Sequence, residues 1–549
     1  MHNKKTSIQI LILYAVCGSI LALPMIFNNL WFLGWMAYAP ILYNEMTGDE
    51  RDEKPYESAW KRGLAFFYGY GLVTFSWLWA IYPLDFAGFD PISAIFVIIL
   101  GWLGIPLVQG SISAFNLVIL KFMKRKGMKH GFYPIVAACA WICFEWMQTL
   151  TWAGIPWSKL AVGQTGMLYN IQSASLFGSY FISFLMILTS GYLAMALINL
   201  RNNKQLIRSA FSFLFAILIF ASNFTYGAIA MKKDREYKDT VTVAAIQGNI
   251  QSVEKWNSEP MEALETHRNL VLEAGEAGAD LIVMAETAIP YTINKDEFLL
   301  PYTEEMVRES DADVIVGCLH LDDDNKLYNS TRYVSNEDGF VETVYNKRRP
   351  VPFGESMPME DIINAILPIL GQLNQASSSI ASGNETAIFE TEHGNVGSLI
   401  CFDSIYESLA IKTVRDGAEL LAISTNDCWF RDSAAVYQHN SHAILRAVEN
   451  GRYVVRSANT GMSSILTDKG EVVEFLEPLV EGYIIGDVKL TTDETLYTKV
   501  GNVIVWMAFV YIGITGTIFV VKSWKDENAS CNNEKPSTKT KKIRKDIKR

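Results

Sequence analysis

An α-helical membrane domain joined to an α/β domain outside the membrane is the fold class that this sequence predicts. Two stretches, residues 1–231 and 496–522, consist mainly of apolar runs with few charges. Between them, residues 232–495 alternate short β-rich runs with helical patterns. Apolar runs of about 20 residues are long enough to cross a bilayer. Strands that alternate with helices indicate a layered α/β domain.

Composition and charge narrow the class of protein. The 549 residues are 50% hydrophobic and 19% charged, which excludes a disordered chain. Seven cysteines in this length exclude a disulfide scaffold, and a net charge of −11 argues against a nucleic-acid partner. The total hides an asymmetry, because residues 232–495 contain 21 Lys and Arg against 45 Asp and Glu. Their net charge is −24, so the rest of the chain carries +13.

Eight segments are candidate membrane spans. Seven precede the α/β domain and one follows it, at residues 7–27, 29–45, 63–83, 92–120, 131–151, 173–200, 209–230 and 499–522. Segment 29–45 is short for a complete crossing and could instead be re-entrant. We expect the first span to be a retained anchor rather than a cleaved signal peptide, because seven further spans follow it.

Lys and Arg residues in the short loops predict the orientation. They gather before the first span and in the second, fourth and sixth loops, whereas the odd-numbered loops are nearly free of them. Because positively charged loops stay in the cytoplasm, we expect both termini there and residues 232–495 on the opposite side of the membrane. Residues 523–549 then form a basic cytoplasmic tail, which we expect to be disordered.

The α/β domain contains no recognisable nucleotide or zinc motif. Its predicted helices cover 259–277, 405–416 and 433–449, and its predicted strands are 241–247, 280–285, 313–319, 340–345, 396–400 and 419–424. We find no GxGxxG, GxxxxGK[ST] or GxSxG motif. His439 and His442 lie three residues apart on a predicted helix. Since no third ligand accompanies them, we interpret them as polar contacts rather than metal ligands.

Three polar residues follow predicted strands: Glu286, Lys347 and Cys401. Active-site residues of layered α/β folds emerge at strand ends. A thiol nucleophile, a carboxylate base and an ammonium that stabilises an oxyanion together suit acyl transfer. Each residue taken singly also fits an ordinary structural role. Cys318 and Cys428 are competing thiols that periodicity does not exclude.

Three features of the remaining sequence stand out. Glu145 lies near the outer end of the fifth span, and a carboxylate inside a membrane is costly unless it has a role. Residues 154–157 follow as a Gly-Ile-Pro-Trp turn. Residues 359–373 form an apolar insert between Lys347 and Cys401, which we interpret as a lid or membrane-dipping arm rather than a buried helix.

The flanks of these residues resemble the nitrilase (carbon–nitrogen hydrolase) superfamily, and the whole chain resembles its apolipoprotein N-acyltransferase family of the bacterial envelope. The most specific stretch is Val-Pro-Phe-Gly-Glu at 351–355, soon after Lys347. The other matching stretches are 247–249, 285–287, 346–348, 426–427, 429–430, 446–449 and 456–461, with Glu145-Trp146 and 154–157 in the membrane part.

The resemblance implies a nitrilase-like α-β-β-α sandwich over residues 232–495 and a multi-pass protein of the inner membrane. It also implies ping-pong acyl transfer, in which Glu286 activates Cys401. A phospholipid donates the acyl chain to a Cys401 thioester, and the α-amine of a diacylglyceryl-cysteine lipoprotein accepts it. Lys347 and the backbone N–H after the nucleophile stabilise the oxyanions. No cofactor and no metal are required, and we expect a monomer.

The resemblance also implies supporting residues. Glu355 orients Lys347 or shares proton transfer, and Trp256 lies at the substrate entrance. The family pair after the nucleophile is Tyr-Glu, whereas this chain has Phe402-Asp403. We expect this pair to flank the acyl site and to influence headgroup choice and the fit of the acceptor.

Two other functions are consistent with parts of the sequence. A membrane-tethered amidase or nitrilase would use the same three residues on a small carbon–nitrogen substrate, but one anchor would suffice for it. A non-catalytic envelope scaffold would not need Glu286, Lys347 and Cys401 in these contexts. We therefore expect an acyltransferase.

Overall fold

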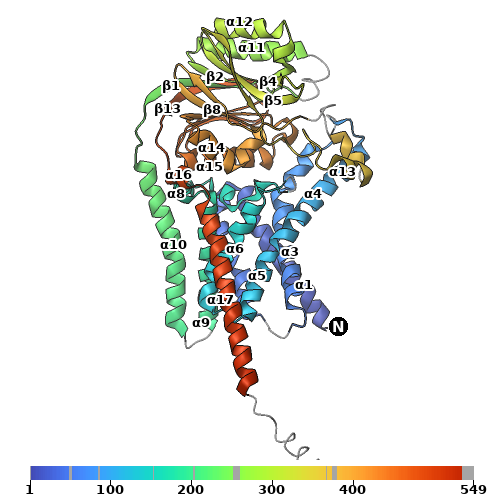
Figure 1. Ribbon diagram of the computed structural model, residues 1–549, viewed down its shortest axis with the longest axis vertical. Helices are drawn as coiled ribbons and strands as arrows, with labels where there is room; N and C mark the ends of the chain where they lie inside the picture. Colours follow the sequence, from blue (N-terminus) through green and yellow to red (C-terminus); the bar gives the residue numbers. More distant parts are fainter. Residues whose placement is uncertain are drawn as a thin grey trace, which may run out of the picture.

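The computed structural model consists of a bundle of apolar helices beneath a two-sheet α/β domain (Figure 1). It describes residues 2–48, 52–84, 87–151, 154–201, 205–251, 260–366, 368–373 and 380–533. The predicted combination of a membrane domain and an α-β-β-α sandwich is confirmed.

The apolar helices run side by side in the lower part of the molecule (Figure 1). Five helical segments in the described part of the chain are long and apolar enough to cross a membrane. The helices of this part are α1 His2–Ala22, α2 Ala39–Thr47, α3 Pro55–Thr74, α4 Pro91–Ser113, α5 Phe115–Arg125, α6 Tyr133–Met147, α9 Ser179–Arg201, α10 Leu206–Lys232 and α17 Val503–Asn533, with short α7 Leu168–Ile171, α8 Ala174–Phe177 and α16 Leu496–Val500.

Two predicted segments of this bundle differ from the structure. Residues 29–45 do not form one helix, because 3₁₀ turns over Asn28–Trp35 lead into the nine-residue α2, where Pro40 stands in the first turn. Proline is favoured in the first turn of a helix and disfavoured in its interior, where it lacks the N–H that a helical hydrogen bond needs. Helix α17 begins at Val503 and continues to Asn533, so the first residues of the predicted disordered tail are helical. The rest of the tail lies outside the described residues.

The α/β domain is built from two sheets packed face to face. One sheet has the order β13-β1-β2-β4-β5-β6, with β3 paired to β4, and the other has the order β12-β11-β10-β9-β8-β7. The strands are β1 Asp239–Gln247, β2 Leu281–Val283, β3 Ile289–Thr292, β4 Asp313–Leu321, β5 Leu327–Ser335, β6 Gly339–Asn346, β7 Ile388–Thr391, β8 Gly394–Ile400, β9 Leu420–Thr425, β10 Val454–Ala458, β11 Ser463–Leu466, β12 Val472–Leu476 and β13 Gly482–Leu490.

Helices cover the outer face of each sheet. Helices α11 (Pro260–Glu276) and α12 (Leu299–Ser310) cover the upper sheet, whereas α14 (Glu407–Arg415) and α15 (Ala434–Asn450) lie between the lower sheet and the membrane helices (Figure 1). All six predicted strands and all three predicted helices of this domain are present. Parallel strands β8 and β9 end at the same edge of their sheet, which places the residues that follow them close together.

Helix α15 also seals the α/β domain onto the membrane helices. Its side chains meet the segment of residues 154–179 that precedes α9, and this boundary is polar and buried. Among the hydrogen bonds across it are Trp157–Gln438 (2.5 Å), Thr165–Ser441 (2.9 Å) and Ser179–Glu449 (2.8 Å). Each bond satisfies a buried polar atom. Together these bonds fix the position of the α/β domain on the membrane helices.

Candidate active site

The three residues predicted at strand ends meet at one edge of the sandwich. Glu286 follows β2, Lys347 follows β6 and Cys401 follows β8. The Lys347 ammonium lies 2.7 Å from a carboxylate oxygen of Glu286 and 2.7 Å from one of Glu355. Glu355, the supporting glutamate that the family resemblance implies, therefore contacts Lys347 directly.

Lys347 is the buried cation of this cluster, with a side chain 1% exposed. Burial alone would lower the pKa of Lys347, but the carboxylates of Glu286 and Glu355 and the Cys401 thiol raise it well above its usual value. The ammonium therefore stays charged throughout the physiological pH range. A charged donor in a buried site is suited to stabilise an oxyanion.

Cys401 occupies a sharp turn between β8 and the short 3₁₀ helix Cys401–Ile405. Its φ is +48°, in the left-handed region that L-residues rarely adopt. Burial, followed by the charge of Glu286, raises the pKa of the Cys401 thiol well above its usual value, although Lys347 opposes the shift. Since the resting thiol is protonated at neutral pH, it needs a base before it can attack.

Asn329 on β5 completes the cluster, and no sequence pattern marks it as a site residue. Its side-chain amide nitrogen donates to Glu286 at 2.7 Å and to Glu355 at 2.8 Å. Its backbone carbonyl accepts the Lys347 N–H at 2.8 Å. One buried asparagine thus separates the two carboxylates while both contact the same ammonium.

The Val-Pro-Phe-Gly-Glu stretch is a turn that aims Glu355 at Lys347. The N–H of Glu355 donates to the carbonyl of Val351 at 2.9 Å, and a Glu355 carboxylate oxygen accepts the Val351 N–H at 2.8 Å. The turn includes Phe353 at a φ of +67°. These bonds hold the second carboxylate in place without substrate.

Phe402 and Asp403 lie beneath the site rather than open to solvent. The Asp403 carboxylate accepts the Tyr345 hydroxyl at 2.8 Å and the backbone N–H of Arg349 at 2.7 Å. Asp403 therefore ties the turn after Cys401 to the segment that carries Lys347. Phe402 is buried against Tyr406, with ring centroids 5.5 Å apart.

The remaining predicted residues have different surroundings. Trp256 lies outside the described residues. Cys318, inside β4, is fully buried, and burial raises the pKa of its thiol to about 12. Cys428 follows β9 and is also buried. The charges of Glu286 and Lys347 act on the Cys401 thiol.

The insert at residues 359–373 forms α13 (Glu360–Ile366) and a 3₁₀ helix over Pro368–Leu373. It projects beside the upper end of α4 (Figure 1). Ile369 and Leu370 pack against an apolar cluster at the beginning of α4, whereas Ile362 and Ile366 are 54% and 70% exposed. A helix that presents large apolar side chains outward next to a membrane helix has the features of an interfacial arm.

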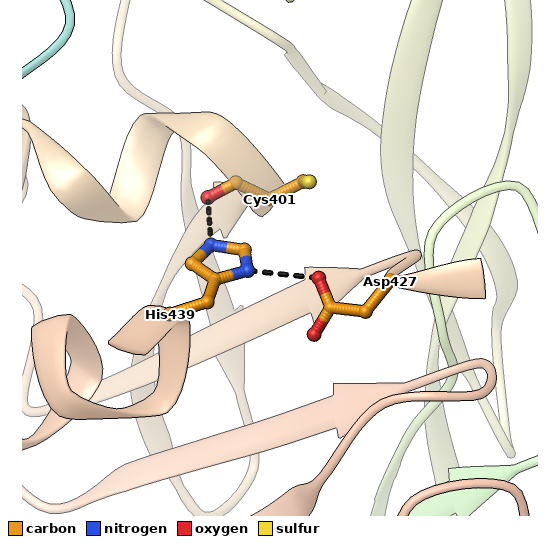
Figure 2. A group of neighbouring side chains, drawn as sticks. All are labelled: Cys401, Asp427 and His439. Carbon is orange, nitrogen blue, oxygen red and sulfur yellow. Dashed lines mark hydrogen bonds and ion pairs between the residues drawn. The ribbon is translucent and has the colours of Figure 1, made fainter. Parts of the chain in front are cut away.

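One buried cluster beside Cys401 has donor atoms that could suit a metal ion: the Cys401 thiol, Asp427 and His439 (Figure 2). Its acidic member is already paired, because Arg456 lies 2.6 Å from Asp427 and 3.1 Å from His439 Nδ1. A metal cation would have to displace or repel that guanidinium. The contacts of His439 are polar ones within the protein, as predicted.

Comparisons with known proteins agree with this architecture. The sequence model described as carbon-nitrogen hydrolase matches residues 242–496, and the one described as apolipoprotein N-acyltransferase N-terminal domain matches residues 17–192. An apolipoprotein N-acyltransferase of Geobacter metallireducens is 28% identical over 494 residues, 89% of this chain and 91% of the relative. One of Haemophilus ducreyi is 25% identical over 523 residues, 93% of this chain and 96% of the relative.

Among solved structures, Saccharomyces cerevisiae Nit3, a member of branch 10 of the nitrilase superfamily, is similar to part of the chain. It is 17% identical and covers 49% of this chain and 97% of its own, with a TM-score of 0.37. The two sequence-model matches cover most of the chain, one in the helical bundle and one in the sandwich. The chain therefore belongs to the apolipoprotein N-acyltransferase family and is an N-acyltransferase with a carbon–nitrogen hydrolase domain.

Proposed function

We propose that this N-acyltransferase takes an acyl chain from a membrane phospholipid and holds it as a thioester on Cys401. It then passes the chain to the α-amine of the N-terminal diacylglyceryl-cysteine of a lipoprotein. The observation that carries the proposal is the buried Lys347 ammonium, 2.7 Å from each of two glutamates, beside a thiol at a strained turn.

The first half-reaction forms the thioester. Glu286 takes the thiol proton, and the sulfur attacks the ester carbonyl carbon, so that an S–C bond forms and the carbonyl oxygen becomes an oxyanion. Lys347 and the Phe402 N–H stabilise that charge. The C–O bond to the glycerol then breaks, and the proton on Glu286 passes to the leaving oxygen, which releases a lysophospholipid.

The second half-reaction uses the same groups in the same order. The free α-amine attacks the thioester carbonyl carbon, and Glu286 accepts a proton from the amine nitrogen. The oxyanion again lies against Lys347. The S–C bond breaks, the sulfur regains a proton from Glu286, and the amide product leaves. Glu355 supports both steps by keeping Lys347 in place.

The membrane domain fits substrates of this kind. Withdrawing an acyl chain from a bilayer costs about 0.8 kcal/mol per CH₂, so the reaction has to take place at the membrane surface. We place the sandwich outside the cytoplasm of a multi-pass inner-membrane monomer, with both termini inside, as the Lys and Arg loops predict. The arm of residues 359–373 and Trp256 would border the lipid entrance, with Phe402 and Asp403 behind it.

Mass spectrometry of lipoprotein N-termini tests the proposal. Lipoproteins from cells that contain the chain should carry an added N-acyl group, and those from cells with a Cys401→Ala variant should end in a free diacylglyceryl-cysteine amine. A membrane-tethered amidase would leave the lipoproteins unchanged while hydrolysing a soluble amide. N-acylation that persists in the Cys401→Ala strain would refute the assignment.

A further inference from the structure

A buried histidine lies directly beneath the nucleophile and has no role in the proposed chemistry. His439, on α15, is 1% exposed, and its Nε2 is 3.2 Å from the carbonyl oxygen of Cys401 (Figure 2). Its Nδ1 is 2.8 Å from a carboxylate oxygen of Asp427. The thiol sulfur points away from the ring in Figure 2, so the ring contacts the backbone of the nucleophile.

The direction of the Nε2 hydrogen bond follows from its neighbours. Nε2 is also 3.1 Å from the Ser404 hydroxyl, which has one proton. That hydroxyl donates to the Cys401 carbonyl at 2.7 Å. Because a carbonyl oxygen can only accept and the Ser404 proton is already used, Nε2 carries a proton that faces both the Cys401 carbonyl and the Ser404 hydroxyl oxygen. The carbonyl oxygen therefore accepts two hydrogen bonds, one from Ser404 and one from His439.

Holding this carbonyl also fixes the next amide. In a planar trans peptide the C=O of one residue and the N–H of the next point in opposite directions. Because Ser404 and His439 hold the Cys401 carbonyl on one side, the Phe402 N–H must point to the other. The Phe402 N–H lies in the first turn of the 3₁₀ helix, where amides have no acceptor within the helix. In the proposed mechanism, this Phe402 N–H donates a hydrogen bond to the oxyanion.

The ring is itself held by its neighbours. Both ring nitrogens donate, Nε2 to Cys401 and Nδ1 to one oxygen of Asp427, and Arg456 donates to the other Asp427 oxygen at 2.6 Å while lying 3.1 Å from Nδ1. Trp157, from the turn that precedes α9 in the membrane part, lies over the ring with centroids 5.5 Å apart. The left-handed backbone at Cys401 is strained, and this set of contacts opposes its relaxation.

We propose that His439 is a positioning residue of the oxyanion site: its Nε2–H bond to the Cys401 carbonyl aims the Phe402 N–H at the substrate oxygen, and Asp427 and Trp157 hold the ring in that orientation. This inference rests on the proposed acyl transfer and deepens it. Trp157, in the Gly-Ile-Pro-Trp turn of the membrane part, thereby helps to position the backbone of Cys401 through its contact with His439.

The positioning role of His439 can be tested by comparing two reactions of the Cys401 thiol. Acylation by a phospholipid passes through an oxyanion, whereas alkylation by iodoacetamide displaces iodide and forms none. In the full-length protein in detergent, His439→Asn keeps a donor near Asp427 but loses the bond to Cys401. We expect it to slow thioester formation about 10²-fold, as the loss of one oxyanion donor does, and to leave the alkylation rate and the KM for phospholipid nearly unchanged.

Two further variants make the test specific. His439→Gln places an amide donor near the position of Nε2 and should recover part of the acylation rate. His442→Gln is the matched control, because His442 is equally buried on α15 and lies near Trp157, with ring centroids 5.8 Å apart, but is hydrogen-bonded to the Trp157 carbonyl instead of Cys401. It should acylate at close to the wild-type rate.

The outcomes separate this inference from the proposed function. If wild-type protein forms no thioester, the proposed function fails. If wild-type protein does form it, the inference is overturned by any of three results: unchanged acylation in His439→Asn, equal losses of acylation and alkylation, or an equal loss of acylation in His442→Gln. A His439→Gln variant no faster than His439→Asn would overturn the hydrogen-bond assignment.

Discussion

Lys159 and Glu407 form a buried ion pair between the membrane part and the α/β domain, and removing the lysine should destabilise the protein. The Lys159 ammonium lies 2.9 Å from a Glu407 carboxylate oxygen, and the side chains are 0% and 1% exposed. The other Glu407 oxygen accepts the Tyr180 hydroxyl at 2.9 Å. The perturbation is Lys159→Met, which keeps most of the side-chain volume and leaves the carboxylate without its nearest cation.

The size of the effect follows from the acidity of Glu407. Burial alone would raise the pKa of Glu407, but Lys159 and then Arg446 lower it from 4.5 to about 2. A shift of this size corresponds to about 3 kcal/mol of stability at neutral pH, at about 1.4 kcal/mol per pKa unit. Breaking a buried pair typically costs about 3–5 kcal/mol. Because Arg446 remains 3.9 Å away, we expect the lower end of that range.

The assay is thermal unfolding of the full-length protein in detergent, followed by tryptophan fluorescence. At pH 7 we expect the Lys159→Met midpoint to fall by roughly 3–5 °C, and the double variant Lys159→Met/Glu407→Gln to recover most of the loss. The folded-state pKa is depressed, so this stability is present above pH 4.5 and is lost as the pH falls toward 2. A single variant as stable as wild type, or a double variant no better than the single, would refute the reasoning.

Four other predictions concern catalysis. Lys347→Met should slow thioester formation by about 10²–10³ through the loss of its charge on the oxyanion; an unchanged rate contradicts that role. Asn329→Ala removes hydrogen bonds to two charged carboxylates, each worth about 1.5–3 kcal/mol, and should slow acylation at least about tenfold in single-turnover assays. Cys318→Ala and Cys428→Ala should retain labelled thioester on gels, whereas a loss in either folded variant would make that thiol the nucleophile. Deletion of residues 360–372 should reduce turnover of phospholipid in vesicles, and an unaffected rate would remove the arm from the mechanism.

The positions of Glu286, Lys347 and Cys401 were predictable because each ends an apolar β-rich run. A polar residue directly after such a run stands at a sheet edge, whereas Glu355 came from the family resemblance that the Val-Pro-Phe-Gly-Glu stretch carries. Asn329 was not predictable in this way. It lies inside β5, a strand with mixed polar and apolar residues, and only tertiary packing brings its amide between two carboxylates.

The surroundings of the nucleophile also depend on contacts that are distant in sequence. Asp403 was expected beside the substrate, yet its oxygens are used by Tyr345 and by backbone N–H groups near Lys347. His439 was interpreted as a polar contact, and its partner, the Cys401 carbonyl, is 38 residues away. Periodicity predicts which face of a helix is buried, and it does not predict which backbone atom that face meets.

The helices of the membrane part were also predictable only in part. Hydropathy located the long apolar helices, because about 20 apolar residues in a row are unambiguous. It did not locate the break in residues 29–45, where 3₁₀ turns precede α2. Irregular backbone at that depth is tolerated only where protein covers it, and that cover comes from residues remote in sequence, such as Gln164, which accepts the Trp35 indole N–H at 2.8 Å.

A chase of isotopically labelled acyl chains tests the central claim most directly. The protein is incubated with a phospholipid that carries a labelled acyl chain, and the peptide that contains Cys401 is analysed by mass spectrometry before and after a diacylglyceryl-cysteine peptide is added. We expect a labelled, hydroxylamine-sensitive thioester on Cys401 that disappears as the label reaches the α-amine of the acceptor. Label that reaches the acceptor without ever occupying Cys401, or that stays on Cys401 when the acceptor is present, would contradict it.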